Sequence, residues 1–426
     1  MNAESIQVVP SASRLTASLR DIGYDFVTAL SDVVDNSVTA GARHVDIRIE
    51  FRGDESFVLV ADDGAGMTAG ALNEALRFGS RRTYSKRDLG KFGLGLKTAS
   101  LSQCTKVTVL SRAARKNRRI ECRVLDLAHI ESTDRWEILA PLVGQMPEEY
   151  VDFLGGRPGT VVVWELLDRV LTYTDPDGYW AKRKLHALAQ ESTQYLGMVF
   201  HRFLAGEAGG RTLKITINGE IVQPWDPYGR EEPAQVTLSP RVFELRVGKK
   251  VGFVRMTPYI LPVRDQFSSQ SAFERLSGPM KWNRQQGLYL YRAGRMIQHG
   301  GWCGIRTLDE HTKLARVAID FDPCLDDLFQ VNVAKMKVTM PTELAGLIEK
   351  PVSEVCLQAG RAYRAGANAS ADATENPGTP AAGGSAKVIG FALKAASLEL
   401  NEQAAFERIV ELVRSRSPEV VESLGW

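Results

Sequence analysis

The chain has 426 residues, which is enough for two or three domains at roughly 100 to 200 residues each. Hydrophobic residues make up 44% of the sequence and charged residues 24%, a composition that excludes a fibrous or wholly disordered protein. Lys and Arg number 53 against 51 Asp and Glu. Because the formal charge is only +2, the chain as a whole is not marked as a binder of nucleic acid or of a membrane surface, which leaves local patches open.

The cellular compartment and the absence of membrane contact are predicted from the cysteine spacing and from the lack of long apolar runs. The five cysteines are widely spaced and form no C-x-x-C pair, which favours a reducing compartment over structural zinc. No run of about 18 apolar residues occurs, and the first 30 residues do not show the basic start and apolar stretch of a signal peptide. We therefore predict a cytoplasmic protein with no membrane partner.

The first half of the chain alternates helical and strand patterns. Apolar residues recur at three and four positions between 11 and 39, with a break at Ile22-Gly23. Alternating and short apolar runs then predict two strands joined near Gly53-Asp54. A helical pattern and a glycine-rich segment follow. The predicted strands of this half are 45–51, 57–61, 106–111, 119–125 and 159–166.

A second domain is expected from about residue 206. A strong hairpin signal at Asn218-Gly219 follows an apolar run, and the later pattern predicts strands at 251–256, 287–292 and 315–321 before a helix at about 341–364. Polar and small residues at 366–386 predict a flexible linker. The predicted domains are therefore 1–205 and 206–365, then the linker and a helical tail at 387–426.

Two side chains of the first long helix are candidates for a metal and water site. Asp32 and Asn36 stand four residues apart, so they share one helix face, away from the apolar stripe. A carboxylate one turn from a carboxamide suits a water and a metal ion. On their own, such pairs usually belong to a solvated face.

A second candidate segment follows the apolar strand 57–61 and reads Asp-Asp-Gly-Ala-Gly-Met at 62–67. A carboxylate at a strand end can accept a hydrogen bond from a base edge, and the two glycines permit close approach of the backbone. A tight turn is the competing interpretation. A calcium loop is excluded because the further oxygen ligands and the terminal Glu are missing.

Phosphate binding is predicted for the segment Gly90–Ser100, which places three glycines before a helix. Free amides at a helix N-terminus bind phosphate. The spelling fits neither a Walker A loop nor a dinucleotide fingerprint, so a different phosphate site is expected. Thr160 adds a hydroxyl at the start of a later buried strand. On its own, a threonine at such a position is most often an ordinary strand residue without a binding role.

In this order, the four segments resemble those of the GHKL ATPases, which include gyrase, the large heat-shock chaperone, histidine kinases and MutL, with MORC proteins as relatives. The resemblance covers roughly residues 11–200 and, more loosely, 210–345. The sequence of the glycine segment is most similar to the MORC and chaperone branch, and the resemblance as a whole is most similar to prokaryotic MORC-like and MutL-like ATPases. It implies an α+β protein, with a Bergerat-type α/β sandwich ATPase domain followed by a transducer-like α+β domain.

The resemblance implies ATP and Mg²⁺ as cofactors and assigns roles residue by residue. Asn36 would hold Mg²⁺, Asp62 would receive the adenine amino group, and Thr160 would support the water network beside adenine. The adenine segment also includes Gly64, Gly66 and Met67, and residues 68–92 would form a mobile lid. The phosphate segment would comprise Lys91, Phe92, Gly93, Leu94, Gly95, Leu96, Lys97 and Thr98.

One residue departs from the family pattern. The family carries Glu where this chain has Asp32, the residue expected to act as general base toward water. Asp is shorter by roughly 1.5 Å, and misplacing a catalytic group by about 1 Å can cost ~100-fold in rate. Either the helix sits closer to the terminal phosphate or hydrolysis is slow. Lys335 of the second domain, with Lys337 as the alternative, is expected to offset the charge of that phosphate.

These residues predict an ATPase that acts as a nucleotide-gated clamp and forms an ATP-dependent homodimer. A nucleotide-gated scaffold or chaperone-like module with little hydrolysis is the alternative. A phosphotransfer kinase is disfavoured because no His precedes Asp32. Double-stranded DNA and proteins of a repair or phage-defence system are candidate partners. Basic runs at 112–119 and 249–250 could follow a phosphate backbone, although such runs are more often solvated faces.

Overall fold

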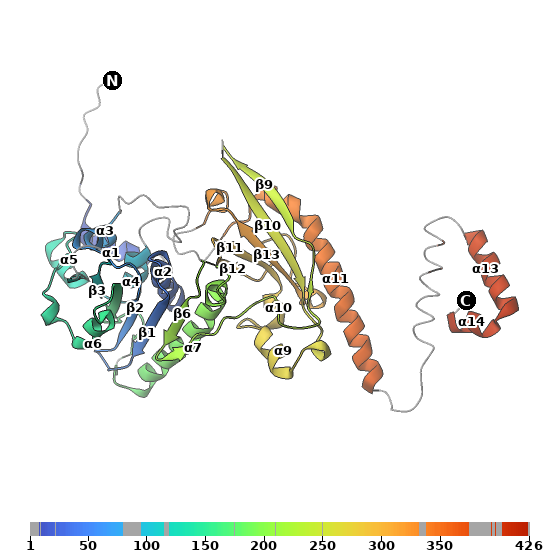
Figure 1. Cartoon of the computed structure of the whole chain (residues 1–426), viewed down its shortest axis with the longest axis horizontal. Helices are drawn as coiled ribbons and strands as arrows, with labels where there is room; N and C mark the ends of the chain where they lie inside the picture. The colour runs from blue at the N-terminus through green and yellow to red at the C-terminus, as the bar shows by residue number, and fades with distance from the viewer. Residues whose placement is uncertain are drawn as a thin grey trace, which may run out of the picture. The chain divides into compact units, whose positions relative to one another are not determined.

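A computed structural model describes residues 8, 10–21, 23–79, 95–114, 119–173, 175–208, 210–248, 250–331, 338–374, 393, 397 and 403–424. The chain divides into two compact units, Met1–Gly366 and Ala367–Trp426. The first unit contains two sheets, drawn from blue to green and from yellow to orange in Figure 1. Within the described ranges, no helix is long and apolar enough to cross a membrane.

The first sheet has seven strands in the order β4-β3-β5-β2-β1-β6-β7. β6 runs parallel to β1, and the other neighbours are antiparallel. The strands are β1 (His44–Glu50), β2 (Phe57–Asp62), β3 (Lys106–Arg112), β4 (Ile120–Asp126), β5 (Gly159–Glu165), β6 (Lys214–Ile217) and β7 (Glu220–Ile221).

Both faces of this sheet are covered, which explains why β2 reads as a continuous apolar run. Val58 and Val60 enter the main core on the helix side, while Phe57, Leu59 and Ala61 enter a smaller core on the opposite face. Successive strand side chains point to opposite faces, so a strand buried on both sides needs no polar positions.

Helices cover the face of the first sheet that forms the main core. Several of these helices begin at a residue whose side chain caps the first turn. Ser11, Asp25 and Thr68 each accept a backbone N–H of the helix that follows, which satisfies one of the four free donors at a helix start. The helices of this part are α1 (Ala12–Arg20), α2 (Phe26–Thr39), α3 (Ala69–Leu76), α4 (Gly95–Leu101), α5 (Leu127–Thr133), α6 (Glu148–Val151), α7 (Tyr179–Val199) and α8 (His201–Leu204).

The second sheet has the order β12-β11-β13-β10-β8, and β9 also pairs with β10. One face packs on the long helix α11 (Thr342–Thr374) and forms a separate core. The strands are β8 (Val236–Thr237), β9 (Arg241–Val247), β10 (Lys250–Ile260), β11 (Gly287–Arg292), β12 (Arg295–His299) and β13 (Ala315–Phe321), with α9 (Gln270–Leu276) and α10 (Lys281–Gln285) between them. The second unit contains α13 (Gln403–Arg416) and α14 (Pro418–Leu424).

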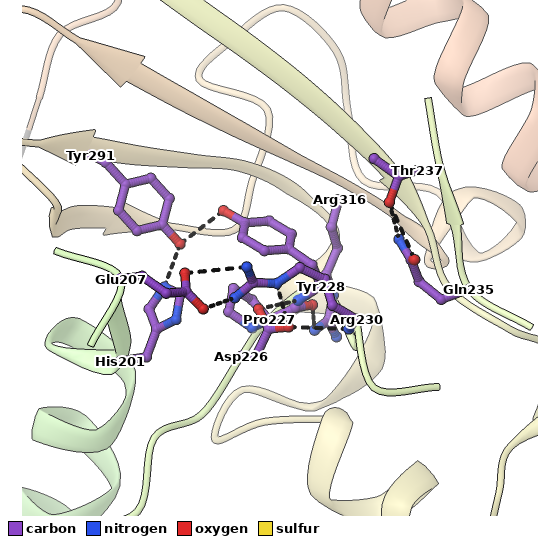
Figure 2. Close-up of polar contacts among 10 residues, drawn as sticks. All are labelled: His201, Glu207, Asp226, Pro227, Tyr228, Arg230, Gln235, Thr237, Tyr291 and Arg316. Carbon is purple, nitrogen blue, oxygen red and sulfur yellow. Dashed lines mark hydrogen bonds and ion pairs between the residues drawn. The ribbon is translucent and has the colours of Figure 1, made fainter. Parts of the chain in front are cut away.

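A buried polar joint connects α8 to the second sheet. His201 Nε2 lies 2.8 Å from Tyr291 Oη of β11, and Tyr228 Oη donates to the same oxygen at 2.8 Å. Figure 2 shows this chain of contacts, with Arg230 bridging Glu207 and Asp226 beside it. Burial lowers the pKa of His201 to about 3, so the imidazole is neutral at physiological pH. Hydrogen bonds therefore connect the two parts of the first unit. The main core connects them as well, because it includes Tyr289, Tyr291 and Met296 of the second sheet.

Three expectations about the elements need correction. The strand at 213–217, expected in the second domain, is β6 and pairs with β1 of the first sheet. α11 continues to Thr374, nine residues into the predicted linker, because the stretch is rich in alanine, the strongest helix former. The expected lid begins with α3, whose Leu72 and Leu76 are fully buried. That helix is anchored, and residues 80–94 lie outside the described part of the chain.

Candidate functional site

Asp32 lies where α2 meets the N-terminal end of α4. Tyr24 Oη donates to Asp32 Oδ2 at 2.8 Å and shares a second hydrogen bond with Thr98 of α4. A Cβ at Gly95 would lie 3.4 Å from the same carboxylate oxygen. Burial and the Asp32 carboxylate raise the pKa of the Tyr24 phenol well above its ordinary value, so it remains a donor. The first and third predicted segments thus meet at Asp32.

The exposed position on this turn of α2 is Asn36. Its side chain is exposed, one turn beyond Asp32, while the rest of the helix from 26 to 35 is buried. An amide oxygen next to a carboxylate is a donor set that suits Mg²⁺, so the residues present fit the ion that the family resemblance implies. Asp35 points elsewhere and forms an ion pair with Arg295 of β12.

Asp62 is held by hydrogen bonds at the end of β2, one of them from the backbone of Thr160. Ser37 Oγ of α2 donates to Oδ2 at 2.9 Å, and the Gly64 amide donates to Oδ1 at 2.9 Å. Burial nevertheless raises the pKa of the carboxyl to about 6. Ser37 ties the first predicted segment to the second. Asp63, the next carboxylate, is structural because its Oδ1 accepts the amides of Arg43 and His44.

The loop after β2 leaves no room for side chains at its glycines. Gly66 has φ +62°, and a Cβ there would lie 1.9 Å from the carbonyl oxygen of Arg112. A Cβ at Gly64 would lie 2.8 Å from the Cβ of Ala40. Both distances are far below a normal contact, so this backbone can pack against β3 and α2 only with glycine at these two positions.

Thr160 stands directly opposite Asp62 in the β2–β5 register. Its hydroxyl lies 3.0 Å from Ser111 Oγ of β3. Ser111 Oγ contacts the carbonyl of Gly159 at 2.9 Å and accepts the Met67 amide at 2.8 Å. The fourth predicted segment is thus joined to the second through one serine.

Lys97 of α4 is buried and contacts α3. Its ammonium donates to the carbonyl of Ala75, near the end of α3, at 2.9 Å, and the residue is 1% exposed. Burial lowers its pKa to about 8. In this geometry the side chain links α4 to α3, because a buried cation needs an acceptor. Thr98 is fully buried, and Leu96 packs against the main core.

Six expected residues lie outside the described part of the chain, and nothing in the structure bears on them. They are Lys91, Phe92, Gly93, Leu94, Lys335 and its alternative Lys337.

Three residues that organise the site were not predicted from the sequence: Tyr24, Ser37 and Ser111. Ser37 directly follows Asn36 in the first segment, which is a signal that could have been used. Tyr24 lies just beyond the predicted helix break. Ser111 had no signal, because its role depends on β3 pairing with β5.

Comparison with known proteins agrees with this geometry. Residues 24–152 match the family described as histidine kinase-, DNA gyrase B- and HSP90-like ATPases. The match includes the first three predicted segments and ends before Thr160. The DNA mismatch repair protein MutL of Salmonella arizonae is 26% identical over 231 residues. That alignment covers 53% of this chain and 33% of MutL, so the chain corresponds to about a third of the length of this relative.

The fold is that of a mixed α+β protein, in which Ser37 of α2 binds the carboxylate at the end of β2 and Asp32 of α2 lies beside Gly95 at the start of α4. Residues 24–152 therefore have the sequence features of the GHKL superfamily of ATPases, and the chain is similar to MutL over about half of its length.

Proposed function

We propose that this protein binds ATP with Mg²⁺ and hydrolyses it to ADP and phosphate, and that the nucleotide controls its dimerisation. One observation carries the proposal: Ser37, Asp62, Ser111 and Thr160 form a continuous chain of contacts from α2 through β2 to β3 and β5. That chain joins the first, second and fourth family segments at one end of the sheet. The family match supports it independently.

In the proposed site each side chain has one task. Asp62 accepts the adenine amino group, and its orientation is fixed by Ser37 and Gly64. Asn36 holds Mg²⁺, which neutralises charge on the phosphates. Asp32 accepts a proton from the attacking water as general base. Tyr24 fixes the orientation of that carboxylate through its 2.8 Å hydrogen bond.

Phosphate release from three proteins tests the hydrolysis step. We expect slow release from the native chain, a loss of at least about 100-fold in Asp32→Ala, as expected when a general base is removed, and a rate at or above native in Asp32→Glu, because the longer side chain reaches further. Asp21→Ala removes an exposed carboxylate paired with Arg169 and serves as the control, with native activity.

The same comparison separates hydrolysis from the alternative of a nucleotide-gated scaffold. Equal rates in the native protein, in both Asp32 variants and in the blank would contradict ATPase activity. Binding of a non-hydrolysable analogue would then support the scaffold.

We further propose that the clamp acts on double-stranded DNA, in a repair or phage-defence setting related to MutL-like and MORC-like proteins. Support comes from the role of the MutL relative in DNA mismatch repair. Two basic residues at strand starts, Arg119 before β4 and Lys250 in β10, are exposed and add to it. The role in DNA mismatch repair belongs to that relative.

Salt dependence tests the DNA proposal. Duplex DNA affinity measured at several salt concentrations, with and without ATP, is expected to fall with a log–log slope of roughly 0.9 per phosphate contacted. We expect a slope of at least about 2 and tighter binding with ATP. Absence of binding at low salt in both nucleotide states would exclude DNA as the partner.

A further inference from the structure

Arg295 is the first residue of β12 in the second sheet. Its side chain contacts α2, a helix that covers the first sheet. Its Nε donates to Asp35 Oδ1 at 2.9 Å, and its Nη2 donates to Ser31 Oγ at 2.8 Å. Its Nη1 donates to the backbone carbonyl of Met296 at 3.1 Å. Arg295 and Asp35 are each 1% exposed and Ser31 is fully buried, so this ion pair is shielded from water and from salt.

Each of the two contacted residues directly precedes a residue of α2 that has a role in the proposed chemistry. Ser31 directly precedes Asp32, and Asp35 directly precedes Asn36. Ser31 and Asp35 are four residues apart and therefore share one face, adjacent to the face of Asp32 and Asn36. A planar guanidinium that donates to both ends of one helical turn fixes its rotation as well as its position.

The apolar contacts of α2 do not supply this constraint, and its hydrogen bonds with Tyr24 and Asp62 hold single side chains at Asp32 and Ser37. Leu30, Val33 and Val34 are buried in the main core, and apolar burial is non-directional, so it tolerates small rotations of the helix. A rotation would move Asp32 and Asn36 together. The chain has Asp at position 32, which is one methylene shorter than the Glu of the family pattern, so its side chain has less reach to compensate for such a movement.

We propose that Arg295 is a positioning residue that sets the rotation of α2, and with it the placement of Asp32 and Asn36 relative to the terminal phosphate. Through it, the position of the second sheet controls the hydrolysis step. This inference rests on the proposed ATPase function. Asp62 and Thr160 lie on β2 and β5, and Gly66 lies in the loop after β2, so the proposed adenine position meets α2 through the single Ser37 hydrogen bond to Asp62 and should depend on Arg295 much less than Asp32 and Asn36 do.

Arg202 provides a matched control. It also joins the first part of the unit to the second sheet, through a two-pronged ion pair with Asp320 of β13, and its guanidinium stacks 3.5 Å from the ring centroid of Tyr291. It belongs to α8 and its ion pair does not involve α2. Loss of either arginine removes an ion pair between the second sheet and the helices of the first part of the unit. Only loss of Arg295 removes a contact of α2.

The experiment compares Arg295→Met, Arg295→Lys and Arg202→Met with the native chain. We expect Arg295→Met to lower kcat for phosphate release at least 10-fold while the Kd for ADP, measured by calorimetry without Mg²⁺, stays within about threefold. Arg295→Lys keeps the charge with fewer fixed donors and should give an intermediate kcat. Arg202→Met should retain native kcat. Hydrogen exchange of the α2 amides should be faster in Arg295→Met than in Arg202→Met.

Removal of Arg295 leaves Asp35 buried without its partner, so the single variant could fail to fold. The double variant Arg295→Met/Asp35→Asn removes the buried charge and should show the same loss of kcat with normal ADP binding. Native kcat in the folded double variant, or an equal loss in Arg202→Met, would overturn the inference. Failure of the native chain to bind ADP or an ATP analogue would instead overturn the proposed function, and native-like α2 exchange in the Arg295 variants would overturn the positioning role by itself.

Discussion

Asp62 is a residue of the candidate site whose charged form lowers the stability of the fold. Its pKa of about 6 lies above its ordinary value of 3.8, and the largest cause is burial. The hydrogen bonds from Gly64 and Ser37 favour the charged form but do not cancel the cost of removing it from water. A carboxylate kept at this cost, at the end of a buried strand, is typical of a functional position.

The sign of the resulting pH dependence follows from that shift. Because the pKa is raised in the folded state, the contribution of Asp62 to stability is fully present below pH 3.8 and is lost as the pH rises through 6. At neutral pH the charged group therefore lowers the free energy of unfolding. A difference of about 2 pKa units corresponds to at most about 3 kcal/mol.

Replacement of Asp62 by Asn removes this penalty. We expect Asp62→Asn to be more stable than the native chain at pH 7.5, by up to about 3 kcal/mol, because no charge is buried. This advantage should shrink as the pH falls from 6 to 4. Urea unfolding of both proteins at pH 4, 6 and 7.5 measures it, with the exposed Asp54→Asn as a control for net charge. ATP binding should be lost in Asp62→Asn alone, and a stability difference that does not change with pH would contradict the assignment.

At the scale of elements, patterns local in sequence predicted local structure. The alternation Val45-Asp46-Ile47 and the run at 57–61 predicted β1 and β2 correctly, because burial on one or two faces determines the spacing of apolar residues. The break at residues 22–23 separates α1 from α2 as expected. The α+β class, which the family resemblance implied, is confirmed as well.

Contacts between distant segments could not be predicted in this way. β6 joins the first sheet by parallel pairing with β1, about 170 residues earlier, and no local pattern specifies such a partner. Asp35 and Arg295 are 260 positions apart, so their ion pair is a product of the tertiary fold. The family segments identified Asp32, Asn36 and Asp62, whereas Ser111 could be found only once β3 was known to pair with β5.

For the whole molecule, nucleotide binding and association should depend on each other. If two copies associate only when ATP is bound, then association must tighten ATP binding by the same factor, since coupling between two binding events is reciprocal. The apparent affinity for a non-hydrolysable ATP analogue should therefore rise with protein concentration. A monomeric binder would show one affinity at every concentration.

Light scattering after size exclusion tests this coupling on the full chain. We expect 47.0 kDa without nucleotide or with ADP, and twice that mass with the analogue and Mg²⁺ at micromolar protein. Asp62→Asn should remain monomeric with the analogue, because it lacks the carboxylate that receives adenine, while the exposed Asp54→Asn control should dimerise normally. If calorimetry shows the analogue bound and the mass stays at that of one chain, the clamp is excluded. The proposed ATPase activity would still stand, because Asp32 and Asn36 of the proposed site come from the same helix of one chain.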